Sequence, residues 1–168
     1  MAHNSLYVLG GFGLILYFST KGVEKIETIK YELTKIEPIY HEWEKQHPES
    51  EITQLMHTFV QKTADLRNTD PLSVKNMTKI ELLQLFTNLT NGPAENLKLL
   101  ACSAFVSDIY DRSLINRFVE IGSNTLTVMK ELFEDVFSQL PGESRETAKI
   151  LTADFANKLQ SITIFSQI

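Results

Sequence analysis

Residues 6–18 read LYVLGGFGLILYF, a run without a charged side chain in a protein whose charged content is 22%. Every charged side chain of the protein lies after residue 20. Such a run needs lipid, a receptor groove or a protein core around it, because its apolar surface is unfavourable in water. A helix over residues 5–20 would be about 24 Å long, against a hydrocarbon core of roughly 30 Å.

We predict that residues 1–21 form a helical membrane anchor, lengthened by Lys21, whose stem can reach toward the membrane interface. Three glycines inside the run lower helix propensity but allow close contact between membrane helices. A cleaved signal peptide and a buried core helix are the alternatives for this run. The candidate anchor residues are Leu6, Tyr7, Val8, Leu9, Phe12, Leu14, Ile15, Leu16, Tyr17 and Phe18.

The distribution of lysines predicts how the anchor would be oriented. No Lys or Arg precedes the run, whereas Lys21, Lys25, Lys30 and Lys35 follow it. The positive-inside rule then places the C-terminal part of a single-pass protein on the cytoplasmic or an equivalent side. A mitochondrial membrane would fit the same layout, and cleavage of the run would instead give a secreted protein.

Residues 22–47 carry a second pattern, which predicts an amphipathic stalk helix. Its apolar positions are spaced 3-4-3-4-3, so they share one helix face. These predicted helix–helix contacts are Ile26, Ile29, Leu33, Ile36, Tyr40 and Trp43. Pro38 lacks the helix N–H donor and is expected to kink this helix. The segment either lifts the following domain off the membrane or packs against it.

Residues 48–168 show helical spacing throughout, so the predicted fold class is all-α, with a compact bundle of about five to six helices. Asn91-Gly92-Pro93 and Pro141-Gly142 are expected to stop helices, and a break is expected near Gly122. Residues 81–105 align with residues 131–155 at an offset of 50. Two similar helical hairpins would explain this, and a short stack resembling armadillo or HEAT repeats is the alternative architecture.

The sequence contains little that predicts chemistry. A net charge of −5 without a Lys/Arg cluster argues against nucleic-acid binding. Cys102 is the single cysteine, so a disulfide within the chain is impossible and a reducing compartment is favoured. Glu44 and His47 have a spacing found in di-iron bundles, but the second copy that such a site needs is missing. We therefore predict no catalytic, cofactor-binding or metal-binding residue.

Taken together, these patterns predict a non-enzymatic, single-pass, membrane-anchored helical protein. It would act as an adaptor or accessory subunit of a larger assembly, through contacts with protein partners that the sequence does not identify. The alternative is a soluble or secreted helical binding protein that holds a partner or a small apolar ligand. A packed core is the simpler interpretation of the phenylalanines that could surround such a ligand, Phe59, Phe86, Phe105, Phe118, Phe133 and Phe137.

Overall fold

The computed structural model describes residues 4–9, 14–64, 79–138 and 142–166. A hairpin of two strands precedes the helices. The elements in chain order are β1 (Asn4–Leu9), β2 (Leu14–Ser19), α1 (Thr20–Leu33), α2 (Ile36–Gln46), α3 (Glu51–Lys62), α5 (Lys79–Leu89), the π-helical turn η2 (Thr90–Ala94), α6 (Glu95–Val106), α7 (Ser113–Phe137) and α8 (Gly142–Ser166).

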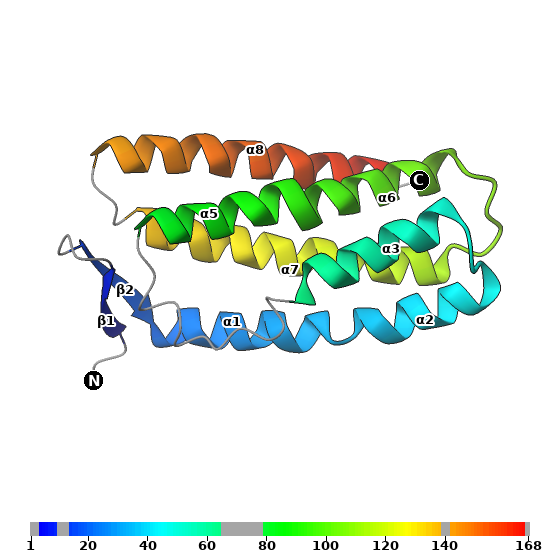
Figure 1. Ribbon diagram of the computed structural model, residues 1–168, viewed down its shortest axis with the longest axis horizontal. Coiled ribbons are helices and arrows are strands. Elements are labelled where there is room, and N and C mark those ends of the chain that lie inside the picture. Colours follow the sequence, from blue (N-terminus) through cyan, green and yellow to red (C-terminus); the bar gives the residue numbers. More distant parts are fainter. Residues whose placement is uncertain (1–3, 10–13, 65–78, 139–141, 167–168) are drawn as a thin grey trace.

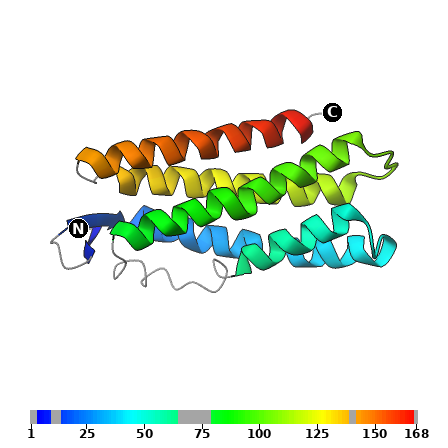
Figure 2. The same cartoon turned by 45° about the horizontal axis from the view of Figure 1, so that its top comes forward.

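Apart from the hairpin, every element within these ranges is helical, so the predicted helical bundle is confirmed. The helices lie along one long axis, with α1 and α2 end to end on one side and α8 on the opposite side (Figures 1 and 2). α7 contacts α1, α2, α6 and α8, while α6 also contacts α3. Fully buried aromatic rings on α3, α5, α7 and α8 link these helices into one hydrophobic core, namely Phe59, Phe86, Phe118 and Phe155.

The N-terminal apolar run forms a hairpin, so the predicted helix over this run is wrong. β1 and β2 pair antiparallel, in a register that places Leu9 opposite Leu14. Gly10, Gly11 and Gly13 separate the two strands in the sequence, and each costs a helix about 1 kcal/mol relative to alanine. The segments on either side are six residues long and contain Tyr, Val, Ile and Phe, which favour strands. The central glycines therefore divide the run into two strands.

The helix break within residues 22–47 lies at Thr34 and Lys35, and not at Pro38 as predicted. The Thr34 N–H donates to the Tyr31 carbonyl oxygen at 3.1 Å, and the Lys35 N–H donates to the Glu32 carbonyl oxygen at 3.0 Å. These tighter turns end α1. Pro38 is in the first turn of α2, where backbone N–H groups have no acceptor within the helix. Both α1 and α2 pack on α7, so this segment belongs to the bundle.

The chain stays helical through Asn91-Gly92-Pro93, where the sequence predicts a stop. α5 leads into η2, which contains Pro93, and η2 leads into α6. The three form one rod in both views (Figures 1 and 2). A π-helical turn accommodates the missing N–H of proline. Gly92, Pro93 and Ala94 are buried, and η2 contacts α3 and α8, so tertiary packing holds a segment that local propensity would break.

The predicted pair of similar hairpins is consequently not formed. α7 and α8 are antiparallel neighbours, whereas α5 and α6 run in line (Figure 1). The expected break near Gly122 is also not formed, because α7 is continuous across it. A Cβ on Gly122 would lie 2.9 Å from Leu97 Cδ2 and 3.1 Å from Phe59 Cζ. This glycine allows α7 to approach α3 and α6 closely and does not mark a turn.

Candidate functional site

The six predicted helix–helix contacts lie on α1 and α2, and all are buried. Their relative exposure ranges from 0% at Ile36 to 7% at Tyr40. Ile39, which the spacing left out, is buried beside them at 3%. Because α1 and α2 pack on α7, and α2 also packs on α3, the side chains of this stripe are buried in contacts within the molecule. A partner must therefore bind elsewhere.

The predicted anchor residues are divided between the strands of the hairpin. Residues 6–9 belong to β1 and residues 14–18 to β2, while Phe12 lies outside the described residues. β2 leads directly into α1, so the hairpin sits at the end of the bundle where α1 begins (Figure 1). Among the described helices, none has both the length and the apolar character needed to cross a bilayer.

The phenylalanines considered as the wall of an apolar ligand site pack mostly against one another. The ring centroid of Phe86 lies 5.1 Å from that of Phe133 and 5.2 Å from that of Phe137. Phe59 and Phe118 meet edge to face, with centroids 5.5 Å apart. Such contacts are typical of aromatic side chains in a packed core. These five rings therefore fill the interior.

Glu44 and His47, which have the spacing found in di-iron bundles, lie near the corner between α2 and α3. Their side chains contact neighbouring residues of α2. The His47 ring stacks on Trp43 with centroids 4.0 Å apart, and the Tyr40 hydroxyl donates to Glu44 Oε2 at 2.8 Å. Burial raises the pKa of the Tyr40 hydroxyl, and the hydrogen bond to Glu44 raises it further. Within the part of the chain that the structure describes, no group of three His, Cys, Asp or Glu side chains could hold a metal ion.

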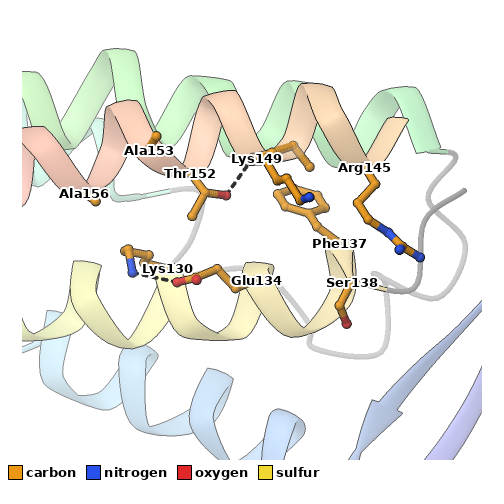
Figure 3. A pocket seen from close by; sticks show the side chains of 10 residues that line it. Lys130, Glu134, Phe137, Ser138, Arg145, Lys149, Thr152, Ala153 and Ala156 are labelled. Atoms are coloured by element: carbon orange, nitrogen blue, oxygen red, sulfur yellow. Dashed lines mark hydrogen bonds and ion pairs between the residues drawn. The ribbon is translucent and has the colours of Figure 1, made fainter. Parts of the chain in front are cut away.

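A cleft of about 460 Å³ lies between α7 and α8 and is the candidate site (Figure 3). Its α7 wall has the spacing 130-134-137 and its α8 wall the spacing 145-149-152-156, so each wall is one helix face. The lining residues are Lys130, Glu134, Phe137, Ser138, Arg145, Ala148, Lys149, Thr152, Ala153 and Ala156.

The floor of this cleft is apolar and consists largely of small side chains. Phe137 and Ala148 are buried, Ala156 is partly buried and Ala153 is exposed. The Thr152 hydroxyl donates to the Ala148 carbonyl at 2.7 Å, so its donor is used within its own helix. The alanines leave space between the two helices that larger side chains would fill. The floor therefore favours a ligand that brings apolar groups.

The rim of the cleft is positively charged, with three cationic side chains and the carboxylate of Glu134. Lys130 Nζ lies 2.6 Å from Glu134 Oε1, one turn along α7 (Figure 3). Lys149 pairs with Glu146 at 3.4 Å, but these side chains are 66% and 71% exposed. An ion pair so exposed contributes little stability and exchanges readily with other partners. Although the protein is acidic as a whole, with a net charge of −5, this cleft is locally basic.

A second exposed surface lies where α6 and α8 end, at the opposite end of the bundle from the hairpin (Figure 1). The rings of Phe105 and Phe165 have centroids 5.6 Å apart, and their neighbours Val106 and Ile164 are 74% and 57% exposed. Residues 99–107 and 159–168 contain no charged side chain. The described residues of these two segments therefore give this apolar patch no charged side chain to select a partner, in contrast to the cleft.

The sequence alone does not predict the cleft, although half of it is visible as a pattern of side chains. Arg145, Lys149, Thr152 and Ala156 share one face of a predicted helix, but nothing in the sequence assigns that face to α7 and not to solvent. Comparisons with protein families, with curated proteins and with solved structures gave no match to this chain. A function for this protein is therefore inferred from the residues of the cleft.

Proposed function

We propose that this protein is a non-enzymatic adaptor or accessory subunit of a larger assembly and acts through protein–protein contacts. The observation that carries this proposal is the α7–α8 cleft, where an apolar floor and a basic rim occur together. A binding surface of this kind combines burial of apolar groups with charges that select the partner.

The bundle suits this role because it holds the cleft on long helices. α7 and α8 each contain 25 residues and pack along their length, and α7 is held from its other sides by α1 and α2. A site on packed helices keeps its geometry when a partner binds, which lowers the entropic cost of association. The sequence-based alternative of a ligand among the core phenylalanines is less well supported, because those rings contact each other.

The proposal does not include a membrane-spanning helix, because residues 4–9 and 14–19 form strands. The membrane location, with the C-terminal part on the cytoplasmic side, stays a prediction from the apolar run at residues 6–18. Partner binding through the cleft is compatible with a hairpin held at a membrane and with a protein free in solution.

The proposal is tested by cross-linking the full-length protein in the cells that express it and identifying the captured proteins. The cleft variant is Lys149→Glu combined with Ala153→Trp, which reverses one rim charge and fills part of the floor. The control is Lys45→Glu on α2, where the side chain is 76% exposed. We expect the cleft variant to lose a defined set of captured proteins that the control retains. Identical sets from both variants would refute an adaptor role for this cleft.

A further inference from the structure

The N-terminal hairpin is a sheet of two strands, and β1 is its outer strand. β1 pairs with β2 along its whole length, and within the described residues no further strand joins this sheet. The main contacts between the hairpin and the helices are those of β2 with α1 and α7. The hairpin extends from the end of the bundle where α1 begins (Figures 1 and 2). Among the described elements, the edge of β1 opposite β2 therefore has no strand to pair with.

This open edge carries backbone groups that need hydrogen-bond partners. In an antiparallel sheet, alternate residues of a strand direct their N–H and C=O groups to one neighbour, and the residues between them direct these groups to the other side. About half of the residues of the six-residue β1 thus present both groups to the open edge. A two-stranded hairpin is only marginally stable in water, and the helices support mainly β2. A third strand would supply the missing hydrogen bonds.

β1 lacks the features by which proteins normally protect an edge strand. Natural edges are blocked by proline, by charged side chains, especially lysine, or by a β-bulge. The sequence of β1, NSLYVL, contains neither proline nor a charged residue. Its pairing with β2 runs without a bulge from Asn4 to Leu9. An edge of this kind accepts a further strand.

The chemistry of the edge selects another apolar strand as its occupant. The hydrocarbon core of a membrane has no hydrogen-bonding groups, so open sheet edges do not occur there. Residues 6–9 are Leu, Tyr, Val and Leu, and strands pair well when apolar residues lie opposite one another. The protein has a net charge of −5, but all its charged side chains follow residue 20. Two hairpins can therefore meet without bringing like charges together, so a second copy of β1 meets every condition.

From these observations we propose that the protein forms a two-fold symmetric dimer in which β1 pairs antiparallel with β1 of a second copy. The result is a four-stranded sheet in the order β2-β1-β1-β2. With the axis between Leu6 and Tyr7, every residue of β1 is paired and Leu6 lies opposite Tyr7 of the other copy. Such a pairing uses the same edge on both copies and closes at two chains.

This inference goes beyond the proposed adaptor function and does not depend on it. The residues that line the α7–α8 cleft all lie between residues 130 and 156, so the hairpin takes no part in the cleft. A dimer formed through the hairpins would carry two copies of the cleft.

Cysteine cross-linking of the full-length protein tests the order of the strands, with Cys102→Ser as the background. One cysteine is introduced on β1, and its control is a cysteine at the paired position of β2, for example Val8→Cys against Ile15→Cys. Neighbouring strands are about 4.8 Å apart, which places the two β1 strands within disulfide reach. The two β2 strands would be about 14 Å apart, whereas a disulfide needs Cα atoms within about 7 Å. The three pairs of positions are Leu6 and Tyr17, Tyr7 and Leu16, and Val8 and Ile15.

We expect mild oxidation to give at least about tenfold more disulfide-linked dimer from one or more β1 variants than from the paired β2 variants. Sedimentation velocity of the reduced parent protein should show a dimer whose fraction rises with protein concentration.

Lysines on the edge strand should weaken the dimer. Leu6→Lys combined with Val8→Lys is expected to raise its dissociation constant about tenfold or more, because lysine blocks strand edges and brings like charges together. The matched control is Val106→Lys combined with Ile164→Lys, at positions that are 74% and 57% exposed in the apolar patch of α6 and α8. This control should change the dissociation constant less than about twofold. Thermal unfolding followed by circular dichroism checks that both variants are folded.

A protein that stays monomeric at every concentration would overturn the inference. Flotation of the monomer with phosphatidylcholine vesicles would also overturn it, because the hairpin would then bind lipid. Equal cross-linking from β1 and β2, or a dimer that only the α6 and α8 lysines weaken, would mean that the interface is elsewhere. Growth beyond two chains would contradict the two-fold pairing. Each of these results leaves the adaptor proposal to be decided by the proteins captured through the cleft.

Discussion

Replacing Gly122 by alanine is expected to destabilise this protein, although the same change inside an ordinary helix stabilises it by about 0.5–1 kcal/mol. The added Cβ would lie 2.9 Å and 3.3 Å from the two Leu97 methyl carbons and 3.1 Å from Phe59 Cζ. Carbon atoms pack favourably at about 3.5–4.0 Å. Leu97 and Phe59 are both 0% exposed, so neither can move away without displacing other core side chains. Overpacking of this kind costs about 1–3 kcal/mol, and a cost in the middle of that range, about 2 kcal/mol, exceeds the helix gain and leaves a net loss of about 1–1.5 kcal/mol.

Urea unfolding followed by circular dichroism measures this loss, and the fluorescence of Trp43, the single tryptophan, gives a second probe. The matched control is Gly142→Ala at the start of α8, because among the described residues no atom beyond its chain neighbours and its own helix backbone lies within 4 Å of the Cβ it would introduce. The control should stay within about 0.5 kcal/mol of the parent protein. If Gly122→Ala is as stable as the parent, with the same dependence on urea, the close approach of α7 to α3 and α6 is wrong.

Three further predictions concern other parts of the bundle. Phe86→Ala should lower the free energy of unfolding by about 3–5 kcal/mol, because this fully buried ring contacts three others; a loss below about 1 kcal/mol in urea unfolding would contradict the packing. The hydroxyl and the N–H of Ser113 donate to Asp111 and lower the pKa of its carboxyl. The ionised Asp111 carboxylate therefore stabilises the fold at pH values above the usual carboxyl pKa, and this stabilisation is lost as the pH falls through the lowered pKa. Asp111→Ala should consequently reduce the dependence of the unfolding midpoint on acid pH. The raised pKa of Tyr40 gives the opposite dependence of stability on pH. The neutral Tyr40 hydroxyl stabilises the fold at pH values below the usual phenol pKa, and this stabilisation is lost as the pH rises through the raised pKa. Absorbance titration should show a late phenol that disappears in Tyr40→Phe and titrates earlier in Glu44→Gln.

Regular spacing was a reliable guide where one helix face packs on one neighbour. The 3-4 spacing from Ile26 to Trp43 identified side chains that are all buried. Ser50 shows the same kind of local determination, because its hydroxyl accepts from the Thr53 N–H and caps α3. In both cases the information lies within a few residues of the chain, and tertiary packing agrees with it.

Secondary structure was predicted wrongly where two local sequence preferences competed. Residues 6–18 are apolar enough to suggest a long helix, but their central glycines and the strand-forming residues on either side give a hairpin. At Asn91-Gly92-Pro93 the outcome is reversed, because a sequence that normally ends a helix is buried and continues as a π-helical turn. Packing against α3 and α8 supplies the energy that the local sequence lacks.

By itself the sequence determined that most of the described chain after residue 20 is helical and which face of most of its helices is apolar, because helix formation depends on neighbours three and four residues apart. It also contained the row of Arg145 and Lys149 on one face of α8. Only the tertiary structure placed that face opposite Lys130 and Phe137 on α7, with alanines between them. The cleft forms between two helices, and which helices lie side by side depends on how all the helices of the bundle pack around the core.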